Sequence, residues 1–186
     1  GARALPDYPE FMLPQALLAD GVAMESLFPL DLDRAFASLD KIKEHVPVWW
    51  SAGAQPVQLL RDNEVQYASA WNGRVFGDDA LGYTFKGGQL NSSYFCIPKG
   101  LPQDLKDHAF AFLHEVSIAK NQGTYASLIP YTGPAKDLQK YLPQDMLSAF
   151  PTTPENKAVQ FVSMPSWWAE HGVEANRRWE QFKLTR

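Results

Sequence analysis

The chain has 186 residues, of which 45% are hydrophobic and 20% charged, and its formal net charge at pH 7 is -4. This composition is typical of a globular protein. The negative balance provides no basic field for a phosphate backbone, so no nucleic acid is expected as a partner. No apolar run in the sequence approaches the roughly 20 residues that a membrane-spanning helix needs.

The first third of the chain alternates short strands with helices. The predicted elements are a strand at 2–5, helices at 15–20 and 32–46, a strand at 48–50, a helix near 56–61 and a strand at 65–71. Pro14 is placed at the first helical position of the first helix. Asp31 is a good N-cap for the second. The alternation predicts an α/β layer.

The stretch from Val65 to Trp71 is the main indication of a binding site in the sequence. Its apolar and small residues alternate with period two, which predicts a buried strand. Asn72-Gly73 then favours a turn with positive φ. A large aromatic and an amide therefore lie at the end of a strand, where open α/β sheets place ligand crevices. The alternative is a core tryptophan before an ordinary turn.

Beyond this point the chain becomes helical. A short helix is expected at 75–80, a strand at 83–85, a flexible break at Gly87-Gly88 and a buried strand at 94–97 that contains the single cysteine, Cys96. Helices follow at 102–119, 123–128, 135–142 and 166–182. They carry apolar stripes but have almost no strands to cover, which indicates that part of their sheet is missing.

Catalytic chemistry has no recognisable motif here. There is no phosphate loop and no dinucleotide-binding glycine pattern, so no cofactor is predicted. The four histidines have no metal-ligand spacing, and Asp78-Asp79 is interpreted as a solvated loop, so no metal site is predicted. No catalytic residue is assigned.

Several residues do suit a binding site. Ser51 and Gly53 precede a predicted helix start, where free N–H groups can accept an anion, although a capping serine is the plainer interpretation. Polar residues Asn91 to Ser93 enter an apolar strand, and Tyr131 lies on a loop. Trp167-Trp168 cannot both face the core of a helix, so one faces a cleft, a partner or solvent.

Several motifs together resemble one known family. They are Ala70-Trp71-Asn72-Gly73, Gly87-Gly88, Phe95-Cys96-Ile97-Pro98-Lys99-Gly100, Tyr131-Thr132-Gly133-Pro134, Pro151-Thr152-Thr153-Pro154-Glu155-Asn156 and the tryptophan-rich last helix. In this order they resemble the C-terminal half of a bacterial ABC-transporter periplasmic solute-binding protein of the spermidine/putrescine-binding kind.

The resemblance implies the type 2 periplasmic binding fold, in which two α/β lobes clamp a ligand. Residues 1–88 would form most of the second lobe, a mixed sheet flanked by helices. Residues 89–186 would form the hinge return and the C-terminal helical part of the first lobe, whose front is absent, as is the export signal. The implied partners are a small-molecule solute, an ABC permease in the membrane, and the missing N-terminal half or a second copy of this chain. The implied location is the periplasm.

The resemblance also implies a site. Trp71 matches the family's aromatic wall, and Asn72 follows it. Polyamine binders carry an aromatic and an aspartate where Asn91 and Ser93 stand here, so the expected charge is missing. The solute could therefore be an amino-acid-like metabolite instead of a polyamine-like amine. Glu10 or Asp7 is another source of negative charge for the site. The candidate ligand-binding residues are Trp71, Asn72, Ser51, Asn91, Ser93, Tyr131 and Trp168.

The predicted function is therefore solute capture for an ABC importer, without catalysis. One alternative is a ligand-sensing or interaction module on the same fold. A further alternative is an α/β enzyme with its pocket near Trp71, which would need a nucleophile or an acid–base pair close to that residue.

Overall fold

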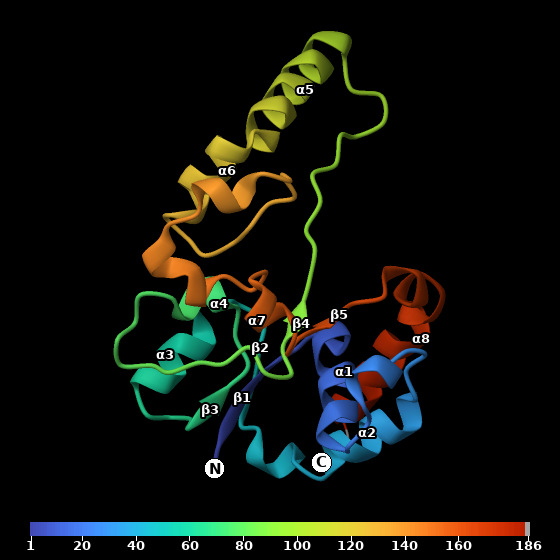
Figure 1. Cartoon of the computed structure of the whole chain (residues 1–186). Coiled ribbons are helices and arrows are strands. Elements are labelled where there is room, and N and C mark those ends of the chain that lie inside the picture. The colour runs from blue at the N-terminus through green and yellow to red at the C-terminus, as the bar shows by residue number, and fades with distance from the viewer. Residues whose placement is uncertain (185–186) are drawn as a thin grey trace. The chain divides into compact units, whose positions relative to one another are not determined.

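The computed structural model describes residues 1–184, which form two compact units (Figure 1). The first unit comprises Gly1–Gln89 and the segment from Val159 onward, and the second comprises Leu90–Ala158. The segment from Val159 joins the first unit, because its strand pairs beside Gly88 and its helix packs on the first unit's core. The assignment of these parts to two lobes stays a prediction.

A three-stranded sheet forms the base of the first unit. The strands are β1 (Arg3–Pro6), β2 (Val48–Trp50) and β3 (Tyr67–Ala68), in the order β2-β1-β3. Leu5 lies opposite Trp49, and Ala4 lies opposite Ala68. All of these pairings are parallel, so the expectation of a mixed sheet is corrected for this sheet, while the α/β class is confirmed.

Three helices enclose the main core of the first unit: α1 (Pro9–Ala19), α2 (Leu32–Asp40) and α8 (Pro165–Leu184). Figure 1 shows α8 beside α1 and α2. Their buried side chains form one apolar cluster, which includes Leu13, Leu17, Leu39, Trp167, Trp179 and Phe182. On α8, the side chains of Ala175, Trp179 and Phe182 are buried together with Trp167, whereas Trp168 is only partly buried, so the two adjacent tryptophans do not both face the core.

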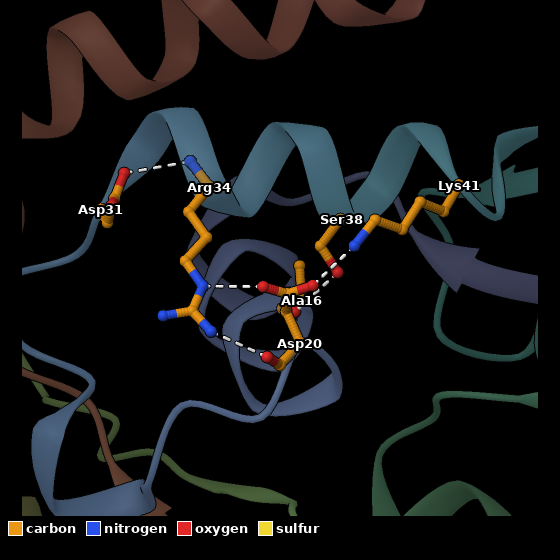
Figure 2. Close-up of polar contacts among 6 residues, drawn as sticks. All are labelled: Ala16, Asp20, Asp31, Arg34, Ser38 and Lys41. Atoms are coloured by element: carbon orange, nitrogen blue, oxygen red, sulfur yellow. Dashed lines mark hydrogen bonds and ion pairs between the residues drawn. The ribbon is translucent and has the colours of Figure 1, made fainter.

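Polar contacts hold the end of α1 against α2 (Figure 2). Asp31 caps α2 as predicted, since its side chain accepts the N–H of Arg34 at 3.0 Å. The side chain of Arg34 donates to the carboxylate of Asp20 at 2.7 Å and to its carbonyl at 2.8 Å, and Lys41 reaches the same carboxylate at 2.6 Å. Two cations therefore lie at the C-terminus of α1, where unpaired carbonyls favour positive charge.

The first helix begins earlier than predicted. Pro9, not Pro14, takes a first-turn position, and Pro14 lies inside α1. The predicted helix at 32–46 ends at Asp40 and is followed by a short 3-10 turn, Lys43–His45. The remaining elements of the first unit are a 3-10 turn (Met24–Ser26), α3 (Gln55–Arg61), α4 (Asn72–Val75), β4 (Gln89–Leu90) and β5 (Phe161–Val162).

The predicted strand from Val65 to Trp71 is wrong in most of its length. Only Tyr67 and Ala68 pair as strand, and the Tyr67 side chain is exposed. Asn72 opens the short helix α4, so the expected positive-φ turn is absent, because Gly73 is helical instead. The strand expected at 83–85 is also absent, and those residues have no regular structure.

The second unit is built from helices and turns. They are α5 (Gln103–Ser117), α6 (Ala119–Ala126), 3-10 turns at Leu138–Tyr141 and Gln144–Ala149, and α7 (Pro154–Lys157). Its small core gathers Ala126, Leu138, Leu142 and Phe150. The buried strand predicted at 94–97 is wrong, since these residues form no strand and Cys96 is exposed.

Within residues 1–184, no helix combines the length and the apolar composition that crossing a bilayer requires.

Candidate ligand-binding site

The strongest candidate site lies at the carboxyl edge of the three-stranded sheet. Because β1, β2 and β3 are parallel, the residues that follow them emerge at one edge. These are Asp7 and Tyr8 after β1, Ser51 after β2, and Ser69 to Trp71 after β3. Open α/β sheets bind ligands at this edge, so the arrangement supports the prediction made for Trp71.

Hydrogen bonds tie the three strand ends together. The Asp7 N–H donates to the Trp50 carbonyl at 2.8 Å, and the Tyr8 hydroxyl donates to the Ser51 carbonyl at 2.8 Å. The indole N–H of Trp50 donates to the Ser69 carbonyl at 2.9 Å. One backbone bond and two side-chain bonds to carbonyls thus hold the edge together and fix the positions of Tyr8 and Trp50.

Aromatic rings line this edge. Trp50 is 1% exposed, and its ring packs edge-on against Tyr8 at 6.0 Å and against Trp71 at 5.3 Å. Phe11, on the first turn of α1, meets Tyr8 edge-on at 5.9 Å. Trp71 itself keeps 37% of its surface exposed. Trp50 is therefore a buried support, and Trp71 is an open aromatic surface that a ligand can contact.

Gly53 leaves room for the ring of Trp71. A Cβ added to Gly53 would lie 2.2 Å from Cζ3 of that ring, which is far inside van der Waals contact. Any side chain at this position would displace the indole. Sequence reasoning assigned Gly53 only to a helix start. The only sequence signal for the role of Gly53 was its place as a glycine in a loop between a strand and a helix. No sequence signal indicated that Tyr8 belongs to the candidate site.

The other predicted residues of the first unit lie as follows. Ser51 is exposed, and Ala54 rather than Ser51 is the N-cap of α3, so the capping interpretation of Ser51 is wrong. Asn72 is half-buried as the first residue of α4, and its carbonyl accepts the N–H of Phe76. Trp71, Asn72 and Ser51 therefore lie at the same edge, and their contact with a ligand stays a prediction.

Three predicted residues belong to the second unit. Asn91 and Ser93 are exposed, and the Asn91 side chain accepts the N–H of Ser92 at 3.1 Å. Tyr131 is half-buried, and its N–H donates to the Ile129 carbonyl at 2.7 Å. Their assignment to the ligand site also stays a prediction.

Trp168 lies beside a cavity of the first unit. The cavity, of about 190 Å³, is lined by Tyr8, Pro9, Glu10, Trp168 and Asn176. The Trp168 ring packs edge-on against Trp167 at 4.9 Å. Its indole N–H is buried and has no acceptor among the described residues. An unpaired buried donor of this kind is uncommon in folded proteins.

The two acids that the sequence offered as sources of charge have different surroundings. Asp7 accepts the indole N–H of Trp179 at 2.6 Å and the ammonium of Lys183 at 3.0 Å. Burial lowers the pKa of Lys183, but its bonds to Asp7 and Glu180 outweigh this, and the net shift is upward. The charge of Asp7 is thus neutralised within the protein, whereas Glu10 has no ion pair within residues 1–184.

No metal centre is formed by the described residues: nowhere in 1–184 do three His, Cys, Asp or Glu side chains gather in a way that could hold an ion. Asp78, one of the two adjacent aspartates, instead pairs with Arg61 at 2.6 Å. The hydrogen bond from Arg61 holds the pKa of the Asp78 carboxyl below its ordinary value.

Known proteins resemble the chain over nearly all of its length. The model of the family described as bacterial extracellular solute-binding protein matches residues 1–158. A gamma-aminobutyric acid-binding protein of Pseudomonas aeruginosa is 33% identical over 187 residues, covering 96% of this chain and 52% of that protein. The chain thus spans about half the length of this curated relative.

Solved structures agree with this. An ABC transporter substrate-binding protein from Bradyrhizobium japonicum USDA 110 has a TM-score of 0.89 and 38% identity, over 97% of this chain and 58% of that chain. The protein MotA of A. tumefaciens B6, solved in complex with glucopine, has a TM-score of 0.82 and 35% identity, over 99% of this chain and 60% of that chain.

The resemblance to ABC solute-binding proteins that the sequence motifs indicated is confirmed by these matches. None of the three relatives is described as a polyamine binder, so the polyamine-like ligand stays unconfirmed. The chain belongs to the bacterial extracellular solute-binding protein family.

Proposed function

We propose that this chain forms a ligand-binding part of the solute-binding component of a bacterial ABC importer. It captures a small amino-acid-like solute at the carboxyl edge of the parallel sheet and contributes no chemistry of its own. The captured solute is delivered to a membrane permease from the periplasmic side. Trp71 provides the aromatic surface that the solute contacts.

The observation that carries this proposal is the edge itself. Three parallel strands end together, a buried tryptophan supports an open one, and Gly53 keeps the space that the open ring occupies. The hydrogen bonds across the edge hold these positions in place before any ligand arrives. A preorganised aromatic surface loses little freedom on binding, which favours affinity.

The class of solute is supported by the relatives. One of them is a γ-aminobutyric acid-binding protein, and another was solved in complex with glucopine. Ser93 stands where the resemblance to polyamine binders called for an aspartate. An amine bound there would lack its counter-charge, and a cation buried without a partner is costly. A zwitterionic or weakly charged solute is therefore proposed over a polyamine.

We further propose that the second unit, here residues 90–158, belongs to the first lobe of a longer binding protein. Support comes from α5, which has no buried residue and whose Leu105, Phe110 and Phe112 are exposed. The chain also spans only 52–60% of the relatives named above. The remainder of the first lobe would cover α5, and pairing with a second copy of this chain is the competing outcome.

The proposal is tested by calorimetry on the complete binding protein, with γ-aminobutyric acid, putrescine and glutamate as probes. Trp71→Ala is expected to abolish binding of whichever probe the unaltered protein takes. Tyr67→Ala, which removes an exposed aromatic from β3, is the matched control and should leave affinity unchanged. Unchanged affinity in Trp71→Ala would contradict the site. A protein that binds none of the probes and co-purifies with no small molecule in native mass spectrometry would contradict the function.

A further inference from the structure

Two helices of the first unit begin at the carboxyl edge of the parallel sheet. Helix α3 follows β2 and the loop that contains Gly53, and α4 begins directly after Trp71. The ring of Trp71 lies so close to Gly53 that an added Cβ would be 2.2 Å from Cζ3 of the ring. The loop that opens α3 therefore contacts the residue that immediately precedes α4.

A second contact joins the far ends of the same two segments. Arg61 is the last residue of α3, and Asp78 follows the end of α4. Nε of Arg61 donates to Oδ2 of Asp78 at 2.6 Å, and the N–H of Ala80 donates to Oδ1 at 3.1 Å. The Asp78 side chain is only 8% exposed. Solvent therefore screens this ion pair less than it screens a fully exposed one.

The segment between Trp71 and Asp78 is short and hydrogen-bonded along its length. The N–H of Arg74 donates to the Trp71 carbonyl at 2.9 Å, and the N–H of Asp78 donates to the Val75 carbonyl at 3.1 Å. Helix α4 has only four residues, so it has little stability of its own and its position depends on the contacts that hold it. Val75 is the buried side chain of this helix. One apolar anchor leaves the helix free to rotate about it, whereas a directional ion pair at its far end restricts that rotation.

The contacts form a closed path. The path runs from Trp71 through α4 to Asp78, across to Arg61, and back along α3 to Gly53. The plainer role of the ion pair is to fasten a surface loop, which would affect stability alone. The closed path predicts a further effect, because a segment released at Asp78 also changes the position of Trp71.

We propose that Asp78, held by Arg61, is a positioning residue for the tryptophan that contacts the solute. The ion pair fixes α4 relative to α3, and it thereby orients the Trp71 ring against Gly53 before a solute arrives. This role rests on the proposed function, since Trp71 is the solute contact proposed there.

The first test measures affinity by calorimetry in the complete binding protein, with γ-aminobutyric acid, putrescine and glutamate as probes. Asp78→Asn removes the charge and keeps the size of the side chain. Affinity for whichever probe the unaltered protein takes should fall about fivefold or more. Arg61→Gln should cause a similar loss, and Arg61→Lys should recover part of it because the positive charge is kept. The double variant should lose no more than either single variant, since both changes break one interaction.

Asp62→Asn is the matched control. Asp62 is an exposed acid beside Arg61, and its carboxylate accepts a hydrogen bond from Gln58 of the same helix at 2.8 Å. The substitution removes the same charge without touching the link between α3 and Asp78. It should change affinity less than about twofold.

The second test reads the position of Trp71 directly, without any solute. The indole N–H resonance of Trp71 is assigned in a ¹⁵N spectrum by its loss in Trp71→Phe. It should shift in Asp78→Asn and in Arg61→Gln, and it should stay in place in Asp62→Asn. The Arg61 side chain is 55% exposed, so Arg61→Gln should fold even if Asp78→Asn does not.

The proposal is overturned if Arg61→Gln leaves the Trp71 resonance where it is, because the pair then only fastens a loop. It is also overturned if the losses of affinity in the two single variants add in the double variant. Failure of the proposed function is a different result, namely that Trp71→Ala keeps its affinity or that no probe binds. Even then, the resonance of Trp71 decides whether the ion pair positions the ring.

Discussion

The two units bury their apolar residues to very different extents. In the first unit, three helices and a sheet enclose Trp50, Trp167, Trp179 and many aliphatic side chains. In the second, four residues form the core, and α5 buries none of its side chains. An amphipathic stripe on a helix therefore predicts only that the helix forms. Whether the apolar stripe becomes buried depends on other segments, distant in the sequence, that pack against it.

The tryptophans provide a way to follow the two units separately. All six, at positions 49, 50, 71, 167, 168 and 179, lie in the first unit. Tryptophan fluorescence therefore reports on the first unit alone, while the far-ultraviolet circular dichroism of α5 and α6 includes the second. Unfolding curves measured with both probes should differ if the two units have different stabilities.

The largest expected effect is in the core of the first unit. Trp50→Ala removes a fully buried ring that contacts Tyr8 and Trp71, and it should destabilise that unit by about 3–5 kcal/mol. Phe110→Ala, on the exposed face of α5, should change stability by only about 0.5 kcal/mol or less. Denaturant titration followed by fluorescence and circular dichroism measures both. Equal losses would mean that the comparison between the units is wrong.

A smaller effect is expected at the candidate site. Gly53→Ala places a methyl group where the Trp71 ring now lies, so the ring must move, at a cost of about 1–3 kcal/mol. Trp71 fluorescence should change, and affinity for the solute should fall. Gly82→Ala is the control, because a Cβ at Gly82 meets nothing within 4 Å. Unaltered fluorescence and affinity in Gly53→Ala would show that Gly53 does not determine the position of the ring.

Loss of a helix cap should cost less. Asp31→Ala removes the acceptor for the Arg34 N–H and should destabilise the first unit by about 1 kcal/mol. Asp31→Asn retains an acceptor at the cap and should recover most of this loss. Thermal melts measure this loss and should show the second unit unaffected, since Asp31 and Arg34 both belong to the first unit. A shift in the second transition would contradict the separation of the units.

The smallest expected effect depends on pH. Hydrogen bonds from Lys41 and Arg34 hold the pKa of Asp20 below its ordinary value of 3.8. A lowered pKa in the folded state contributes stability above the unfolded value, and this contribution is lost as the pH falls below 3.8. Asp20→Asn should therefore be less stable than the unaltered protein at neutral pH. This difference in the free energy of unfolding should shrink as the pH falls below 3.8. Asp79→Asn is the control, and a pH-independent difference for Asp20→Asn would contradict this account.

Local signals in the sequence predicted part of the fold well. The strand at 48–50 and the capping role of Asp31 agree with the structure, because both depend on residues close in sequence. Pro14 misled, since two prolines compete for the start of α1 and Pro9 comes first. The alternation from Val65 to Trp71 fits a strand. However, the central strand β1 is only four residues long, and only Tyr67 and Ala68 of that stretch pair with it. Pairing length is a tertiary property that periodicity does not contain.

The positions of the candidate site residues also followed only in part from local signals in the sequence. Trp71 followed from its place after a strand, and the structure puts it at the expected edge of the sheet. Tyr8 and Trp50 belong to the same aromatic group, but they are 42 residues apart in sequence, and only the parallel register brings them together. The choice of Glu10 over Asp7 as the free acid also needed the fold, because the partners of Asp7 come from α8.

The return of the chain to the first unit also determines when the core of that unit can form during synthesis. Residues 1–89 cannot complete their core during synthesis, because Trp167, Trp179 and Phe182 of α8 are still absent. A chain emerging at about 5–20 residues per second leaves that apolar surface open for several seconds while the second unit is translated. The final compaction of the first unit therefore waits for the last helix.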